Sequence, residues 1–193
     1  MRGELVTATT SCLRCYALTE MKRYQAPWGT PLIVISTLAT FLCLGITIFR
    51  WPSLTLAHLG QWSFWLSLFP LTLVIVCALF TIRGYSLAPD TLIIHRLFWS
   101  TRLSLAGLQS AEYQPGAMRG SIRTFGNGGF FSFSGRYWSR VLGSYRAYVT
   151  DFRRTAVLRF PGHTVVLSPE PPEDFVHELS TNRRNACPAP PRL

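Results

Sequence analysis

Acidic residues are scarce in this sequence, and the scarcity argues against several kinds of site. Nine Asp and Glu residues stand against 19 Lys and Arg, which gives a formal charge of +10. The nine acids form no convincing pair for general acid–base catalysis. The four histidines lack the spacing of metal ligands, and Ser132 and Ser134 lack the glycines of a nucleophile elbow. We therefore expect no enzymatic activity, no cofactor and no metal.

Cysteines are also few, and their positions predict no covalent framework. Cys12 and Cys15 form one CxxC pair without a second pair, so a zinc site is not expected. Cys43 and Cys77 lie inside apolar runs, where cysteine behaves as a small hydrophobic residue. No disulfide pattern is indicated.

Lysine is nearly absent, because Lys22 is the only one and arginine supplies almost all of the positive charge. Such a balance favours anionic partners, either nucleic acid or a lipid surface. Arginine enrichment can also reflect the base composition of a genome. Beside long apolar runs, lipid headgroups are the better prediction.

Two uncharged apolar runs predict a transmembrane hairpin. The first covers residues 31–49 and the second residues 61–82. At about 1.5 Å per residue, each is long enough for a hydrocarbon core of about 30 Å. Pro70 is expected to kink the second helix without ending it. Two buried core helices are the alternative, but so small a protein would struggle to surround them.

The flanking residues predict the orientation of this hairpin. Trp28, Arg50, Trp62 and Arg83 stand at its ends, as expected for residues at headgroup depth. Basic residues are concentrated before the first run and after the second, while the connecting loop carries only Arg50 at its edge. By the positive-inside rule, both termini are expected in the cytoplasm of a bacterium, with the hairpin in its plasma (inner) membrane.

The N-terminal segment, residues 1–30, is expected to be cytoplasmic. The first apolar run starts too late and is too long for a cleavable signal peptide. Residues 1–20 look unlike the start of a membrane protein, whereas the sequence from Met21 resembles one. A translation start at Met21 is the alternative reading.

After the hairpin, the hydrophobic period changes to that of short strands. Alternation and turn residues predict strands within 85–105, 105–113, 121–125, 130–135, 144–151, 155–160 and 164–169. The period changes again at Pro172, where Phe175, Val176 and Leu179 fall at helical spacing. We expect a helix over residues 172–180 that closes an open end of the β structure, and a disordered tail over residues 181–193.

Residues 85–179 resemble the bacterial pleckstrin-homology (PH)-like proteins that carry two transmembrane helices before one such domain. The resemblance rests on YSLAPDTLIIHR, RTFGNGGFFSFSG, LGSYRAYVTD and VVLSPEPPEDFVHEL. It implies a mixed α+β chain in which the hairpin precedes a mainly β PH-like domain over residues 84–180. That domain would be a seven-stranded sandwich or barrel closed by a C-terminal helix. Phosphoinositide-binding PH domains use a basic cluster between their first two strands, and here that turn is Ala88-Pro89-Asp90, so this ligand is not carried over.

The glycine-rich segment Gly126–Gly129 fits neither common phosphate-binding motif. Phe131 stands where GxGxxG requires its third glycine, and GK[ST] is absent. A turn that needs positive φ explains the glycines. The alternative is a backbone-lined site to which Arg123 adds charge.

Arginines and aromatic residues crowd the second half of the domain. The candidates for an anionic contact are Arg119, Arg123, Arg136, Arg140 and Arg146. They would bind lipid headgroups or an acidic partner, each basic side chain contributing about 1 kcal/mol near a membrane surface. The alternatives are a solvated basic face, a protein partner or RNA, and nucleic acid is not expected because the chain is tethered to a membrane.

Two functions remain open from the sequence. One is a membrane-anchored binding or scaffold module that docks a protein partner, or itself, at the cytoplasmic face. The other is an ancillary subunit of a transporter or envelope-stress complex, in which the hairpin makes the essential contacts.

Overall fold

The computed structural model describes residues 21–50 and 62–185, which form one strand, a helix pair, nine further strands and a C-terminal helix. The elements, in chain order, are β1 (Lys22–Gln25), α2 (Thr30–Phe49), α3 (Trp62–Leu79), β2 (Ile82–Leu87), β3 (Thr91–Arg96), β4 (Ser100–Ser104), β5 (Ser110–Tyr113), β6 (Ile122–Gly128), β7 (Phe133–Ser139), β8 (Gly143–Val149), β9 (Ala156–Phe160), β10 (His163–Leu167) and α4 (Pro172–Asn185). Three segments about which the sequence made predictions lie outside the described residues: residues 1–20, the loop 51–61 and the tail from residue 186.

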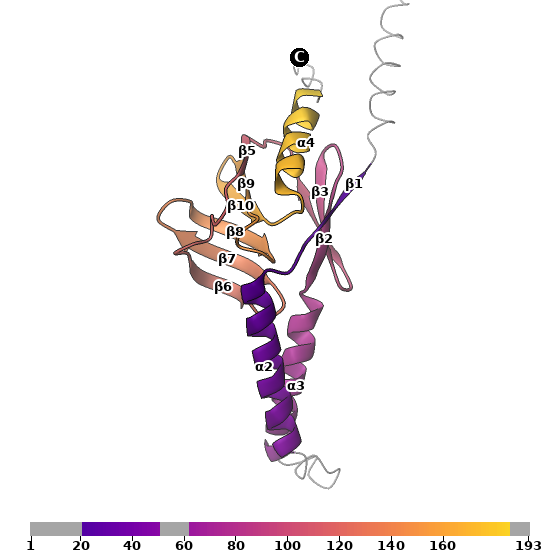
Figure 1. Ribbon diagram of the computed structural model, residues 1–193, viewed down its shortest axis with the longest axis vertical. Helices are drawn as coiled ribbons and strands as arrows, with labels where there is room; N and C mark the ends of the chain where they lie inside the picture. Colours follow the sequence, from indigo (N-terminus) through magenta and orange to yellow (C-terminus); the bar gives the residue numbers. More distant parts are fainter. Residues whose placement is uncertain (1–20, 51–61, 186–193) are drawn as a thin grey trace, which may run out of the picture.

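The strands form two sheets that face each other across a hydrophobic core (Figure 1). The first has the order β1-β2-β3-β4, and the second has the order β5-β9-β10-β8-β7-β6. Neighbouring strands are antiparallel except β8 and β10, which are parallel. The domain is therefore sandwich-like, as expected. The predicted number of seven strands and the alternative of a barrel are wrong, because the described residues form two open sheets of four and six strands.

The core between the sheets is closed by α4, which the figure shows standing beside both of them (Figure 1). Phe175 and Leu179 of α4 are buried against Tyr85 and Leu158, one from each sheet. Glu173 and Asp174 lie in the first turn of α4, where acidic side chains favour a helix start. The predicted closing helix is thus present. It continues to Asn185, so residues 181–185 are helical and do not belong to a disordered tail.

Strand β1 was not expected. It lies in the segment predicted to be a cytoplasmic N-terminal extension, yet it pairs with β2 from Lys22 opposite Leu87 to Gln25 opposite Gly84. Tyr24 is buried and its ring meets Phe175 edge-on, with ring centroids 5.0 Å apart. The domain therefore takes its first strand from before the helix pair and the remainder from after it.

Helices α2 and α3 pack side by side below the sheets (Figure 1). The buried residues of α2 are Leu32, Ser36 and Thr47, and those of α3 include Phe64, Ser67 and Pro70. Most of the large apolar side chains point outward; among them are Ile33, Leu38, Phe41, Leu42, Ile48 and Phe49 on α2, and Trp62, Trp65, Leu66, Phe69 and Leu73 on α3. This distribution is the reverse of a water-soluble helix pair, which buries its large apolar residues.

The second helix of the predicted hairpin is shorter than the sequence indicated. Among the described residues, α2 is long and apolar enough to cross a membrane, and only 17% of its most apolar window is buried. The apolar stretch of α3, Phe64–Leu79, is shorter than such a span. Residue 82, assigned to the second run, begins β2, because Ile82 is buried in the domain core and pairs with Arg96.

Candidate functional site

The five candidate arginines lie on both faces of the second sheet and at its ends. Arg136 of β7 is directly opposite Arg146 of β8. Arg123 of β6 is opposite Tyr137 and shares its face of the sheet. Tyr137 follows Arg136 on β7, and successive residues of a strand alternate, so this is the face opposite to that of Arg136. The structure therefore brings Arg136 and Arg146 together and separates Arg123 from them.

Arg119 and Arg140 lie outside the strands. Arg119 belongs to the segment that crosses from β5 to β6, and Arg140 to the turn between β7 and β8. All five side chains are exposed, and within residues 21–50 and 62–185 none of the five makes an ion pair. Arg154 differs, because it pairs with Asp151 and Glu170.

The Arg136–Arg146 pair concentrates positive charge at one point of the sheet. Like charges directly opposite each other on neighbouring strands repel and destabilise the sheet. No acidic residue belongs to β6, β7 or β8. This arrangement is suited to an anion supplied from outside the domain.

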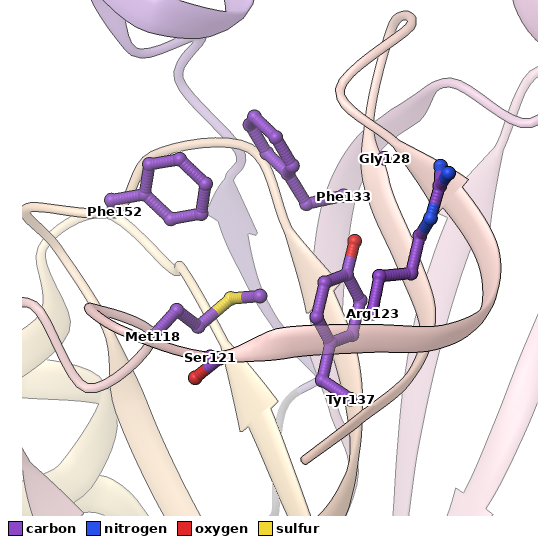
Figure 2. Close-up of a pocket in the computed structure, with 7 residues that line it drawn as sticks. All are labelled: Met118, Ser121, Arg123, Gly128, Phe133, Tyr137 and Phe152. Atoms are coloured by element: carbon purple, nitrogen blue, oxygen red, sulfur yellow. The ribbon is translucent and has the colours of Figure 1, made fainter. Parts of the chain in front are cut away.

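A cavity of about 250 Å³ lies on the other face, beside Arg123 (Figure 2). Its lining is Met118, Ser121, Arg123, Gly128, Phe133, Tyr137 and Phe152. The rings of Phe133 and Phe152 lie 4.2 Å apart between centroids, and Figure 2 shows them across the cavity from Ser121. Arg123 thus adds a cationic group to a mostly apolar hollow.

Tyr137 connects this cavity to the glycine-rich segment. Its hydroxyl donates a hydrogen bond to the Asn127 carbonyl oxygen at 2.9 Å. Burial raises the pKa of Tyr137 to about 12, while the charge of Arg123 acts in the opposite direction. At neutral pH the hydroxyl is therefore protonated and serves as a donor.

The glycine-rich segment is mostly strand, which corrects the predicted turn over Gly126–Gly129. β6 continues to Gly128, and the chain turns over residues 129–132. Asn127 closes this turn, because its side-chain amide donates to the Phe130 carbonyl oxygen and its Oδ1 accepts from the Phe130 N–H. Gly126 has φ of 113° and Gly129 has φ of 112°, so positive φ explains two of the three glycines.

An aromatic collar surrounds the junction between the helix pair and the domain. We define it by its residues: Trp28, Phe80, Trp99, Phe130 and Phe131. Trp28 meets Phe131 with ring centroids 6.0 Å apart, and Phe80 meets Trp99 at 5.1 Å. The Ser132 hydroxyl also donates to the Phe80 carbonyl oxygen at 3.1 Å. Tryptophan and other amphipathic aromatic residues are typical of the depth where a membrane meets water.

Arg96 contacts two rings of this collar. Its guanidinium lies over the rings of Phe80, Trp99 and Tyr148, at 5.4 to 5.9 Å from their centroids. Burial lowers the pKa of Arg96, and the rings offset part of the cost of desolvating its charge. Tyr148 lies two residues after Arg146 on the same face of β8, so Arg96 extends the basic side of the sheet toward the helices.

Sequence reasoning missed most of the collar and Arg96, although it singled out Trp28. The collar comes from four separate segments of the chain, and its members touch only because the sheets bring their loops to one end. The only local signals were the consecutive aromatic residues Phe98-Trp99 and Phe130-Phe131.

Comparison with known proteins identifies the domain. A family model described as "Bacterial PH domain" matches residues 83–183, more than half of the chain. No curated protein and no solved structure matches significantly. The matched region contains both sheets except β1, together with most of α4. The chain belongs to the bacterial PH domain family.

Proposed function

We propose that this protein is a membrane-anchored binding module, with α2 and α3 forming a hairpin in the bacterial plasma membrane. The observation that carries the proposal is the outward display of large apolar side chains along both helices. In a bilayer, small residues let helices approach closely while large apolar residues contact lipid. The 18 residues of α3 extend about 27 Å, close to the thickness of a hydrocarbon core.

The fold supports binding as the activity of the exposed domain. PH domains are generally binding modules without catalytic activity. The partner we propose is anionic: lipid headgroups or an acidic protein surface that contacts Arg119, Arg123, Arg136, Arg140 and Arg146. These side chains are exposed and unpaired by acidic residues in the described chain, which supports this role.

The domain and both chain ends are proposed to lie in the cytoplasm. Because β1 precedes α2 and pairs with β2 after α3, the two outer ends of the helix pair are on the same side. The basic residues before and after the helices support the cytoplasmic side.

Two fusions at the C-terminus test this proposal. A fluorescent protein that matures only in the cytoplasm should be bright, and an alkaline phosphatase that needs export should be inactive. The full chain should also remain with membranes during alkaline carbonate extraction. The reverse pair of reporter results would contradict the orientation, and extraction into the supernatant would contradict the anchor.

A further inference from the structure

Strand β6 is a free edge with an unusual surface. It is the last strand of the six-stranded sheet, so one side of its backbone has no neighbouring strand in the described chain. Ile122 and Phe125 on this strand are 63% and 77% exposed. Long apolar edge strands are normally covered or interrupted by charge, because they invite association.

This edge faces the same direction as the helix pair. The turn after β6 is bonded to Ser36, which lies about 9 Å along α2 from Thr30 at 1.5 Å per residue. Figure 1 shows β6 as the lowest strand of its sheet, level with the start of α2.

Basic side chains flank the apolar edge on both faces. Arg123 lies on the face of Tyr137, and Arg136, opposite Phe125, lies on the other face. An apolar edge with an arginine on each face fits the boundary between acyl chains and anionic headgroups.

We propose that the β6 edge rests in the headgroup layer of the membrane that the helix pair enters. Phe125 and Ile122 reach toward the acyl chains, while Arg123 and Arg136 bind the phosphates of anionic lipids. This inference rests on the proposed membrane anchor. The edge stays at headgroup depth, because unpaired backbone N–H and C=O groups are not tolerated in the hydrocarbon region.

A second copy of the chain fits this edge less well. Pairing two β6 strands would bring Arg123 and Arg136 of both copies close together, and neither β6 nor β7 carries an acid to offset them. Like charges on neighbouring strands oppose such pairing.

Site-specific fluorescence on the full chain in nanodiscs tests the proposal. With the native cysteines replaced by serine or alanine, a bimane is attached through Phe125→Cys or through Glu112→Cys. Glu112 is exposed on β5, the opposite edge of the same sheet, about 24 Å away at the usual strand spacing. Lipids spin-labelled at the headgroup should quench the label at position 125 and leave the label at 112 at background.

The arginines are tested by lipid composition. Quenching at position 125 should be stronger in phosphatidylglycerol nanodiscs than in phosphatidylcholine nanodiscs. Arg123→Gln combined with Arg136→Gln should abolish that difference. The matched control is Arg159→Gln, on the same face as Arg123 but four strands away, or about 19 Å, and it should retain the difference.

A third label separates failure of this inference from failure of the anchor. Leu42 on α2 is exposed and should be quenched by acyl-chain spin labels if the helices enter the bilayer. Quenching at 42 without quenching at 125 would overturn the β6 contact and leave the anchor standing. No quenching at either position would overturn both, and crosslinking between two copies through position 125 would replace the lipid by a second chain.

Discussion

The backbone nitrogen of Phe131 lies 2.9 Å from the side-chain oxygen of Ser36, so α2 holds the turn between β6 and β7 directly. Ser36 donates in turn to the Gly129 carbonyl oxygen at 3.3 Å. Phe131 has φ of 63°, a conformation that side chains other than glycine rarely adopt, and this hydrogen bond helps to hold it there. The helix pair and the domain are thus joined by more than their covalent connections.

Ser36→Ala should lower the free energy of unfolding of the domain. The buried Gly129 carbonyl and the half-buried Phe131 N–H would lose their partner, at a cost of about 1 to 3 kcal/mol. Thr37→Ala is the control, because Thr37 is exposed on the next position of α2. Denaturant unfolding in detergent, followed by near-ultraviolet circular dichroism, measures both variants. Equal midpoints for the two variants would show that the contact does not stabilise the domain.

Tyr24→Ala should be strongly destabilising although it lies before the helices. Removing a buried aromatic ring costs about 3 to 5 kcal/mol when the cavity cannot collapse. Tyr24→Phe keeps the ring and its edge-on contact with Phe175, so it should be close to the unmodified protein. Unfolding midpoints of the full chain give the comparison. A small loss for Tyr24→Ala would mean that β1 adds little to the domain.

Gly126→Ala should cost more stability than Gly120→Ala. Both glycines have positive φ, so both substitutions introduce backbone strain. At Gly126 a Cβ would also lie 2.7 Å from the Gly135 Cα on β7, whereas at Gly120 it would meet open space. Thermal unfolding separates the two effects, because the difference between the variants reports the close approach of β6 and β7. Equal losses would attribute the whole effect to φ.

The stability of the domain should fall at alkaline pH, in part because of Tyr85. Its hydroxyl is buried and donates to the Tyr148 carbonyl oxygen at 2.6 Å, and burial raises its pKa from 10.0 to about 12. Between these values the unfolded chain loses this proton while the folded chain keeps it. The free energy of unfolding therefore decreases as pH rises from about 10 toward 12.

The variant Tyr85→Phe isolates this contribution. It should be less stable than the unmodified protein at pH 8, because the Tyr148 carbonyl loses a donor, and the difference should shrink as pH approaches 12. Denaturant titrations across this range measure the gap. A constant gap would show that Tyr85 does not ionise differently in the two states.

Local patterns predicted the closing helix and most strands, because these elements bury one face and show it in their spacing. Phe175 and Leu179 of α4 are examples. β1 carried no such signal, since four residues with one buried side chain show little alternation. Its strand character depends on β2, which follows two helices later.

The sequence predicted which residues belong to the candidate site but not how they are arranged in space. The sequence identified the arginines, but the faces they occupy depend on which residues pair across β6, β7 and β8. The glycine-rich segment illustrates the same limit. Gly126 lies opposite Gly135, and only that pairing explains why β6 continues through a sequence typical of a turn.

Because β1 pairs with β2, the domain is complete only when the chain segments before α2 and after α3 meet on the same side. During synthesis β1 is made first and has no partner until α3 has returned to the same side. A chain inserted with only one crossing would leave the two strands on opposite sides of the bilayer. Tyr24 would then be missing from the core, and the defective protein would expose apolar surface to proteases and chaperones. For the proposed membrane hairpin, completion of the sheet would thereby depend on both helices having crossed the bilayer.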